Sequence, residues 1–239
     1  MRNRALEHTY ARANWGLKFR PDANTVLWLP GQDDNYSSTI RDRSGQGNDG
    51  TITGATWAQT GQGLWYLKFT EDAGDNVNCG ADSSLDLGSS WTIFMWFFSS
   101  DTASETGGLM SKDDGTTNRD FFITIRNASP AGVLQLAHRI SDVEKLFISG
   151  ITVDDGNWHL AFFMNDGTDL IIDNDGTVET DAGKGGATDN EGADLLLGRW
   201  RVSEELDGGI ALARIVNNKV LSVDERTSIR NQERHLFGV

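Results

Sequence analysis

The chain has one cysteine, Cys79, among its 239 residues. A lone cysteine cannot form an intrachain disulfide, and it excludes zinc sites built from several thiolates and CxxC redox chemistry. Proline is scarce, with 3 residues, whereas glycine reaches 27. No apolar run approaches the roughly 20 residues of a membrane-spanning helix. We therefore expect no membrane insertion, and the many glycines between short apolar runs are typical of a turn-rich β protein.

Positive charge is also in short supply. The chain carries 21 Lys and Arg against 35 Asp and Glu, which gives a formal net charge of −14 and a pI of about 4.6. Because phosphate binding needs clustered Lys and Arg, this balance argues against nucleic acid and anionic membrane as partners. The simplest explanation of the acidic residues is a set of solvated strand faces and loops.

The first residues depart from this acidic pattern. Residues 1–22 hold five basic and two acidic side chains, namely Arg2, Arg4, Arg12, Lys18, Arg20, Glu7 and Asp22. We interpret residues 1–25 as a basic arm and 26–239 as one folded domain, with a frayed terminus or an extra edge strand as the alternative. The segment has no apolar h-region, so we expect a protein made without export, unless an upstream signal was removed.

From Val26 onward, short apolar or alternating runs recur between turn signals such as NDG and DDG. We predict strands at 26–30, 50–58, 64–70, 91–99, 107–112, 121–127, 133–140, 145–150, 158–165, 169–174, 194–200 and 208–216. One helix is predicted over 221–237, where Ser222 and Glu225 have the capping-box spacing. The pattern predicts an all-β fold of two packed antiparallel sheets with one short C-terminal helix.

Four segments, taken in order, resemble one known family. They are VLWLP with IRDRSGQGNDGTITGATW, SLDLGSSWTIFMWFFS, DDGNWHLAFFMNDGTDLIIDNDGT, and LLLGRW with LDGGIALARIVNNKVLSVDERTSI. From about residue 26 to 232 the chain resembles the laminin G-like branch of the concanavalin A-like jelly rolls. The resemblance implies a jelly-roll sandwich, but it is much less specific for function, because this fold hosts many roles.

The first segment raises the question of calcium. The resemblance implies that Asp42 and Asn48 correspond to the part of the motif that helps to ligate calcium in many family members. A second carboxylate often comes from a later strand, where this chain has Ala211 and Leu212. Asp33, Asp34 or Asp207 are possible substitutes by composition alone. The alternative is a glycine-rich loop in which Asp42 and Asn48 cap their own backbone.

Catalysis finds little support in the residue pattern. Glycosidases on this fold carry E-x-D-x-x-E on one strand, and neither Glu179-Thr180-Asp181 nor Glu205-Leu206-Asp207 completes it. Alginate lyases use Gln-x-His, whereas Gln135 and His138 are three residues apart and would face opposite sides of a strand. We therefore predict a protein without enzymatic activity.

Two functions remain as main alternatives. The first is a structural, decoration or adhesion module on a virus particle, most plausibly a tailed phage, in which Arg2, Arg4 and Arg12 dock onto a neighbouring protein or a second copy. The second is a free extracellular lectin-like module that binds cell-surface glycan. Trp200, flanked by Arg199 and Arg201, is the predicted ligand-binding group, with a rim aromatic that covers the sheet as the alternative. A domain that binds another protein is a third possibility.

Overall fold

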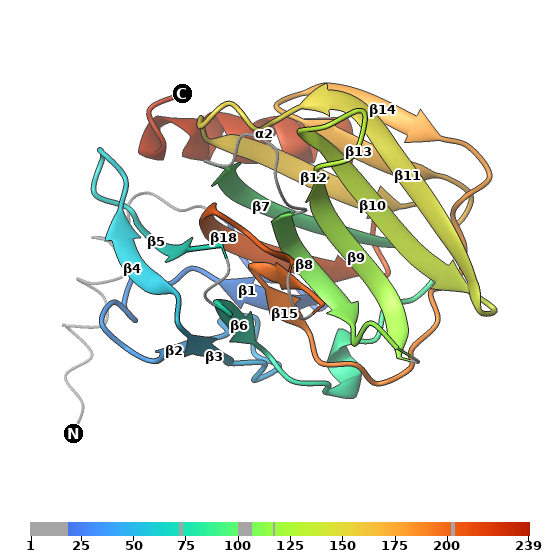
Figure 1. Cartoon of the computed structure of the whole chain (residues 1–239), viewed down its shortest axis with the longest axis horizontal. Helices are drawn as coiled ribbons and strands as arrows, with labels where there is room; N and C mark the ends of the chain where they lie inside the picture. Colours follow the sequence, from blue (N-terminus) through green and yellow to red (C-terminus); the bar gives the residue numbers. More distant parts are fainter. Residues whose placement is uncertain (1–18, 72–73, 100–106, 117, 202–203) are drawn as a thin grey trace.

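In the computed structural model, the described residues (19–71, 74–99, 107–116, 118–201 and 204–239) form two large antiparallel sheets that face each other (Figure 1). The first, sheet A, has the strand order β14-β13-β12-β7-β18-β5-β4, and β1 also pairs with β18. Its strands are β1 (Thr25–Leu29), β4 (Thr56–Gln59), β5 (Trp65–Phe69), β7 (Trp91–Ser99), β12 (His159–Asn165), β13 (Leu170–Asn174), β14 (Thr177–Asp181) and β18 (Gly208–Asn217).

The second, sheet B, has the strand order β11-β10-β9-β8-β15-β6-β3-β2. Its strands are β2 (Thr39–Ile40), β3 (Gly50–Thr53), β6 (Asn76–Asn78), β8 (Gly107–Asp113), β9 (Arg119–Arg126), β10 (Val133–Ile140), β11 (Val143–Thr152) and β15 (Leu196–Leu197). A small hairpin, β16 (Arg199–Trp200) with β17 (Glu204–Glu205), forms a separate two-stranded sheet. The predicted all-β sandwich is confirmed.

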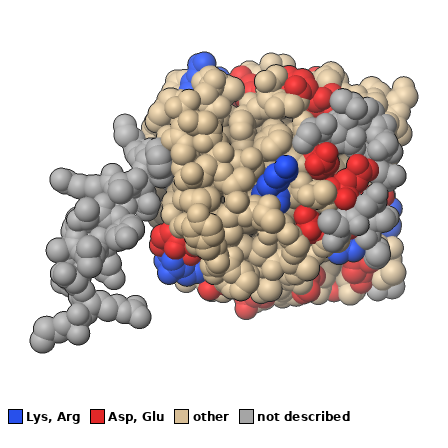
Figure 2. All heavy atoms as spheres, turned by 60° about the vertical axis from the view of Figure 1, so that its left-hand side comes forward, with Lys and Arg blue, Asp and Glu red and all other residues tan. Residues whose placement is uncertain are grey.

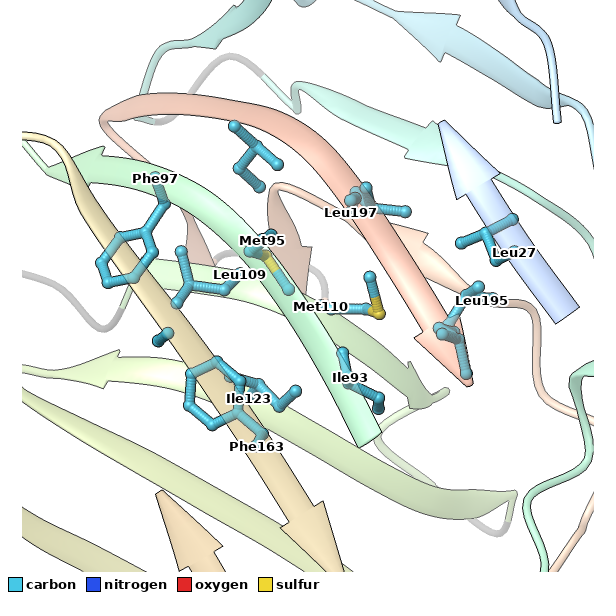
Figure 3. Packing of buried hydrophobic residues seen from close by; sticks show 14 of the residues in the cluster. Leu27, Ile93, Met95, Phe97, Leu109, Met110, Ile123, Phe163, Leu195 and Leu197 are labelled. Atoms are coloured by element: carbon cyan, nitrogen blue, oxygen red, sulfur yellow. The ribbon is translucent and has the colours of Figure 1, made fainter. Parts of the chain in front are cut away.

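The main core lies between the two sheets, where alternate side chains of each strand meet (Figure 3). On β9, Phe121, Ile123 and Ile125 belong to this core, whereas Phe122 and Thr124 between them lie on the outer face of sheet B. Because successive strand side chains point to opposite faces, the alternation read from sequence places each residue on its face. In Figure 3, Met95 and Ile93 of β7 face Met110 and Leu197 of the opposite sheet.

A second apolar cluster covers the outer face of sheet A. The helix α2 (Val223–Glu233) and the following 3₁₀ turn (Arg234–Leu236) close over it, and Phe237 stacks on Trp96 with ring centroids 4.1 Å apart. The predicted capping box is present. The Ser222 hydroxyl accepts from the backbone N–H of Glu225, and the Glu225 carboxylate accepts from the backbone N–H of Ser222. No helix in the described ranges is long and apolar enough to cross a membrane.

Several expected strands are divided in the structure. The predicted strand 50–58 is two strands, because Gly54 turns at φ 71° and carries the chain from β3 in sheet B to β4 in sheet A. The predicted strand 194–200 is likewise broken at Gly198, at φ 77°, into β15 and β16. The short strands β2, β6 and β17 were not predicted, because two or three residues carry too little periodicity.

Candidate functional site

The β16–β17 hairpin lies directly on the outer face of sheet B. After β15 the chain turns at Gly198, whose N–H donates to the carbonyl of Leu109 at 3.0 Å, and the hairpin folds back over β8. Gly108 of β8 makes this close approach possible, since a Cβ atom there would lie 2.2 Å from the backbone nitrogen of Trp200. The Ser111 hydroxyl then donates to the Arg199 carbonyl at 2.9 Å. The sheet therefore holds the hairpin at a fixed position.

Trp200 packs between two groups. Its ring stacks on Phe122 with centroids 4.1 Å apart, and the guanidinium carbon of Arg201 lies 3.9 Å from the ring centroid. At these distances both partners cannot share one face, so the two ring faces are covered. The indole N–H donates to Asp113 at 3.1 Å, and the residue is only 8% exposed. Trp200 thus anchors the hairpin, as in the rim-aromatic alternative.

A polar hollow opens beside this hairpin, with a cavity volume of about 470 Å³. Its walls come from the outer faces of β6, β8 and β15 and from two adjoining loops. The lining consists of amide, carboxylate, guanidinium and small side chains: Asn76, Asn78, Asp113, Asp114, Asn118, Gly192, Ala193, Asp194, Leu196 and Arg199. Such a hollow presents hydrogen-bonding groups of both kinds over a concave surface.

The carboxylates of the hollow are held by neighbouring donors. Asp113 accepts from the indole N–H of Trp200 and from the backbone N–H of Gly115. Asp194 accepts from the Asn78 amide at 2.8 Å. Asp114 accepts from the backbone N–H and the hydroxyl of Thr116. These bonds fix the oxygens in place, which presents preorganised acceptors to a ligand.

The two arginines of the predicted ligand group lie differently. Arg199 lines the hollow, where its Nε donates to the Arg201 carbonyl at 2.6 Å and lies 3.4 Å from Glu205. Arg201 stacks on Trp200 and takes a left-handed backbone, with φ 62°. Arg199 therefore lines the hollow, whereas the stacked Trp200 and Arg201 are not among its lining residues. The predicted docking residues Arg2, Arg4 and Arg12 lie outside the described residues.

The glycine-rich loop after β2 is organised by Asp42. Its carboxylate accepts from the backbone N–H groups of Trp28, Ser44, Gly47 and Asn48, and from the Ser44 hydroxyl. The distances run from 2.6 Å for the hydroxyl to 3.2 Å for Gly47. A carboxylate offers about four lone-pair sites, so these donors use its acceptor capacity.

The same loop shows whether calcium fits. The Asn48 amide donates to the Val26 carbonyl at 2.9 Å and to the Ser84 hydroxyl at 2.8 Å, so its nitrogen tethers the loop. Ala211 and Leu212, at the position of the family's acidic pair, are buried in the apolar cluster over sheet A. Calcium needs six to eight oxygen ligands. Since N–H and O–H donors engage the Asp42 oxygens, the contacts match the alternative in which Asp42 caps backbone groups.

Another acidic cluster joins Asp142, Asp189 and Glu191, whose nearest oxygens lie within 4.8 Å of one another. Asp189 accepts the backbone N–H groups of Ser141 and Asp142, both at 2.8 Å. Its carboxylate thereby caps the turn between β10 and β11. These bonds account for the position of Asp189 without a metal ion.

The residues tested for catalysis are not brought together on one face. His138 of β10 points into the core, where its ring lies 6.0 Å from that of Trp91 and bonds to the Thr188 hydroxyl. Gln135 follows the outward alternation of Ala137 on the same strand. The prediction that Gln135 and His138 face opposite sides is confirmed by this arrangement.

Most of the hollow was not predicted from sequence. Its residues come from three separate segments, 76–78, 113–118 and 192–199, and only the tertiary fold brings Asn118 into the same hollow as Asp194. One local signal was present, because Asn76 and Asn78 alternate with the buried Val77 in the run NVN. Three residues are too few to predict a strand, but within a strand this spacing puts both amides on the same face, opposite Val77.

Comparison with solved structures gives relatives of the same fold at low identity. The binding domain of Paraclostridial Mosquitocidal Protein 1 has a TM-score of 0.65 and 13% identity, covering 87% of this chain and 52% of that one. The botulinum neurotoxin serotype D ligand-binding domain, in complex with N-acetylneuraminic acid, has a TM-score of 0.62 and 13% identity, covering 87% and 50%. The binding domain of botulinum neurotoxin DC, in complex with SialylT, has a TM-score of 0.62 and 12% identity, covering 88% and 52%.

This chain spans about half the length of those structures, and at such identity the likeness shows the fold alone. No curated protein sequence matches the chain. A family model described as the concanavalin A-like lectin/glucanases superfamily matches residues 70–225, which is more than half of the chain. The match confirms the resemblance inferred from the sequence motifs. The chain therefore belongs to the concanavalin A-like lectin/glucanase superfamily.

Proposed function

We propose that the protein is a non-catalytic module that binds glycan in the polar hollow on the outer face of sheet B. The observation that carries the proposal is the lining of that hollow, in which amides and carboxylates surround a concave surface next to a rigid hairpin. Sugar hydroxyls both donate and accept hydrogen bonds. Asn76, Asn78 and Asn118 offer donors and acceptors, whereas Asp113 and Asp194 offer acceptors only.

The charges of the hollow favour a neutral or weakly basic glycan. Three carboxylates line it against one guanidinium, and Arg199 also lies beside Glu205. An anionic sugar such as a sialic acid would meet this negative field at short range. Two of the structural relatives were solved in complex with N-acetylneuraminic acid and with SialylT; those complexes support glycan binding as the proposed role, but not the same sugar.

The absence of catalysis is part of the proposal. A general acid in a glycosidase has to donate a proton to the leaving oxygen. The carboxylates of the hollow instead accept hydrogen bonds from Trp200, Asn78 and Thr116. They are positioned to hold hydroxyl groups, and this arrangement supports recognition without cleavage.

A glycan array tests the proposal with one matched pair of variants. We expect the wild-type chain to bind neutral glycans, and Asn76→Ala combined with Asn118→Ala to lose those signals. Asn231→Ala, which removes an exposed amide from α2 on the opposite side of the sandwich, is the control and should bind normally. A blank array for the wild-type chain, or full binding by the double variant, would contradict glycan binding in the hollow. Release of reducing ends from polysaccharide would contradict the non-catalytic part.

We further propose that the module is displayed on a virus particle, with an extracellular lectin as the alternative setting. The support is the charge asymmetry of the sequence, in which a basic start precedes an acidic body. A basic arm could attach to an acidic surface on another virion protein or on a second copy. Figure 2 shows acidic groups at the surface of the folded body.

The arm is tested by reversing its charge without shortening the chain. We expect Arg2→Glu, Arg4→Glu and Arg12→Glu together to abolish co-sedimentation with virus particles, or to dissociate an oligomer in light scattering. Lys68→Glu, at an exposed site on β5, makes a smaller charge change and should leave attachment unchanged. Unimpaired attachment of the triple variant would refute the role of the arm. The glycan-binding proposal does not depend on this result.

A further inference from the structure

A second feature, with no residue in common with the lining of the hollow, involves the loop of residues 30–38 and the adjoining strand β5. Tyr36 in this loop is 83% exposed. The other large hydrophobic side chains exposed in the described ranges are valines: Val143, Val178, Val223 and Val239. Tyr36 is thus the single strongly exposed aromatic ring in that part of the chain. A single exposed apolar side chain is common on protein surfaces, so the significance of Tyr36 depends on its backbone and on its neighbours.

The backbone of Tyr36 makes the exposure more informative. Tyr36 has φ 68°, in a turn closed by the N–H of Ser37 donating to the Asp34 carbonyl at 2.8 Å. Glycine or asparagine is favoured at such a position, because a Cβ atom crowds the left-handed conformation. A tyrosine here accepts strain while leaving its ring in solvent. Residues held in sparsely populated backbone regions cluster at ligand-binding and active sites, so this conformation makes Tyr36 a candidate for a functional role.

Neighbouring residues hold the ring in place. The Tyr36 ring meets Trp65 edge to face, with centroids 5.5 Å apart. Gln32 ties the loop to β5, since its amide donates to the Trp65 carbonyl at 2.9 Å and accepts from the Trp65 N–H at 3.0 Å. On the other side, the indole N–H of Trp57 donates to the Ser37 carbonyl at 2.9 Å. The two rings are therefore preorganised rather than loosely placed.

The loop also carries polar groups next to the rings. Asp33 forms ion pairs with Arg41 and Arg43, and all three side chains remain more than one third exposed. Arg41 donates to the Asp34 carboxylate from both its backbone N–H and its side-chain Nε. The rim thus combines acceptors and donors in fixed positions beside an aromatic surface. Figure 2 shows the side of the molecule that carries β4, where charged groups are sparse over much of the face.

We propose that Tyr36 and Trp65 form a second glycan site, which stacks the apolar face of a neutral pyranose ring against Tyr36. Specific protein partners usually cover about 800 Å² on each side. The isolated exposed ring, among scattered valines, is too small an apolar area for such an interface. It matches one sugar ring, whose C–H face packs on an aromatic ring while its hydroxyls reach a polar rim. The site takes a neutral sugar because the rim pairs its charges internally.

The site formed by Tyr36 and Trp65, called the platform below, is separate from the hollow in sheet B. Trp65 belongs to β5, which pairs with the edge strand β4 in sheet A, whereas the hollow lies on β6, β8 and β15 of sheet B. A glycan chain or a cell surface that reaches both sites would be held more tightly than by either alone. Glycan binding at Tyr36 does not require glycan binding in the hollow.

The experiment uses Tyr36→Gly, with cellohexaose, maltohexaose and chitohexaose as probes in calorimetric titration. At φ 68° a glycine is unstrained, so the variant should stay folded in a thermal melt while it loses the ring. We expect at least one probe to bind the wild-type chain, and its Kd to rise by about tenfold or more in Tyr36→Gly. Tyr36→Phe should retain binding. Val178→Ala, which trims an exposed side chain on β14 at the opposite edge of sheet A, should behave as wild type.

Each outcome separates the two sites. Loss of binding in Tyr36→Gly but not in the Asn76 and Asn118 double variant assigns the sugar to the platform. Binding lost only in the double variant overturns the platform and leaves the hollow intact. No binding of any probe by the wild-type chain also overturns the platform.

Discussion

Arg214 of β18 and Glu233 of α2 form a fully buried, two-pronged ion pair that joins the helix to sheet A. Nη1 of Arg214 lies 3.2 Å from one carboxylate oxygen of Glu233, and Nη2 bonds to the other oxygen. Trp96 donates its indole N–H to the same carboxylate at 2.9 Å. The guanidinium also stacks on Trp28, 4.0 Å from the ring centroid. Burial lowers the pKa of Arg214, and the charge of Glu233 opposes that effect.

Removing one member of this pair should destabilise the fold strongly. We expect Glu233→Ala to lower the free energy of unfolding by about 3–5 kcal/mol, because the Arg214 charge would remain buried without its partner. Arg214→Met combined with Glu233→Leu should recover much of the loss, since neither charge is then buried. Urea denaturation of the three proteins measures both effects. Equal stability of the single and double variants would mean that the charge pairing does not matter.

His159 of β12 should make stability depend on pH. Its Nδ1 lies 2.7 Å from Asp175 and its Nε2 lies 3.0 Å from Asp155. Burial lowers the pKa of His159, but the two carboxylates more than offset burial, so its pKa is raised above 6.5. The protonated ring therefore stabilises the folded chain fully below pH 6.5, and this stabilisation is lost as the pH rises through the raised pKa of His159.

The partner carboxylate sets the acid side of this window. Burial alone would raise the pKa of Asp155, but hydrogen bonds from Asn157 and the His159 charge lower it from 3.8 to about 2. Its contribution is present above pH 3.8 and is lost as the pH falls toward 2. We expect His159→Gln to be least stable, relative to wild type, between pH 3.8 and 6.5, where Asp155 is ionised and His159 is protonated. The difference in the free energy of unfolding should be smallest at about pH 9. Denaturant unfolding across this range tests it, and a pH-independent difference would contradict the assignment.

Gly108 should be intolerant of any side chain. A Cβ atom at this position would lie 2.2 Å from the Trp200 nitrogen and 2.3 Å from the Arg199 carbonyl carbon. We expect Gly108→Ala to displace the β16–β17 hairpin and to lower the free energy of unfolding by about 1–3 kcal/mol. Glycan binding in the hollow should weaken as well, because Arg199 moves with the hairpin. Gly61→Ala, where no atom lies within 4 Å of the added Cβ, is the matched control in a thermal melt.

Asp42 should stabilise the glycine-rich loop without calcium. Because its carboxylate accepts from Trp28, Ser44 and further backbone donors, Asp42→Ala should lower the free energy of unfolding by about 1–3 kcal/mol. Addition of about 1 mM calcium should leave the melting temperature of the wild-type chain unchanged. Gln46→Ala, an exposed neighbour in the same loop, is the control. A calcium-dependent rise in melting temperature that Asp42→Ala abolishes would restore the metal site.

The local parts of the fold were readable from the chain. Strands β7 and β10 have the predicted bounds of 91–99 and 133–140, because each is a long, mostly apolar run of strand length between turn signals. The helix start was readable from Ser222 and Glu225, since a capping box acts within one turn. These signals depend on neighbours a few residues apart, which the sequence lists side by side.

The candidate sites were mostly beyond such reasoning. Arg199 was singled out and does line the hollow. For Trp200 the sequence left a ligand-binding ring and a rim aromatic open as alternatives, and the ring lies between Phe122 and Arg201. Its burial follows from Gly108, a residue of another strand that lets the hairpin settle on the sheet. No pattern within 199–201 contains that information.

The sequence by itself determined the two-sheet sandwich, its acidic surface and its capped final helix, because alternation, charge and capping are properties of short stretches of chain. The tertiary structure alone decided which polar groups meet in the hollow and that the Asp42 carboxylate accepts hydrogen bonds from backbone N–H groups. It also decided that Tyr36 stands in solvent against Trp65. Contacts between residues tens of positions apart depend on strand register and loop path, and those are set only when the whole sandwich closes around its core.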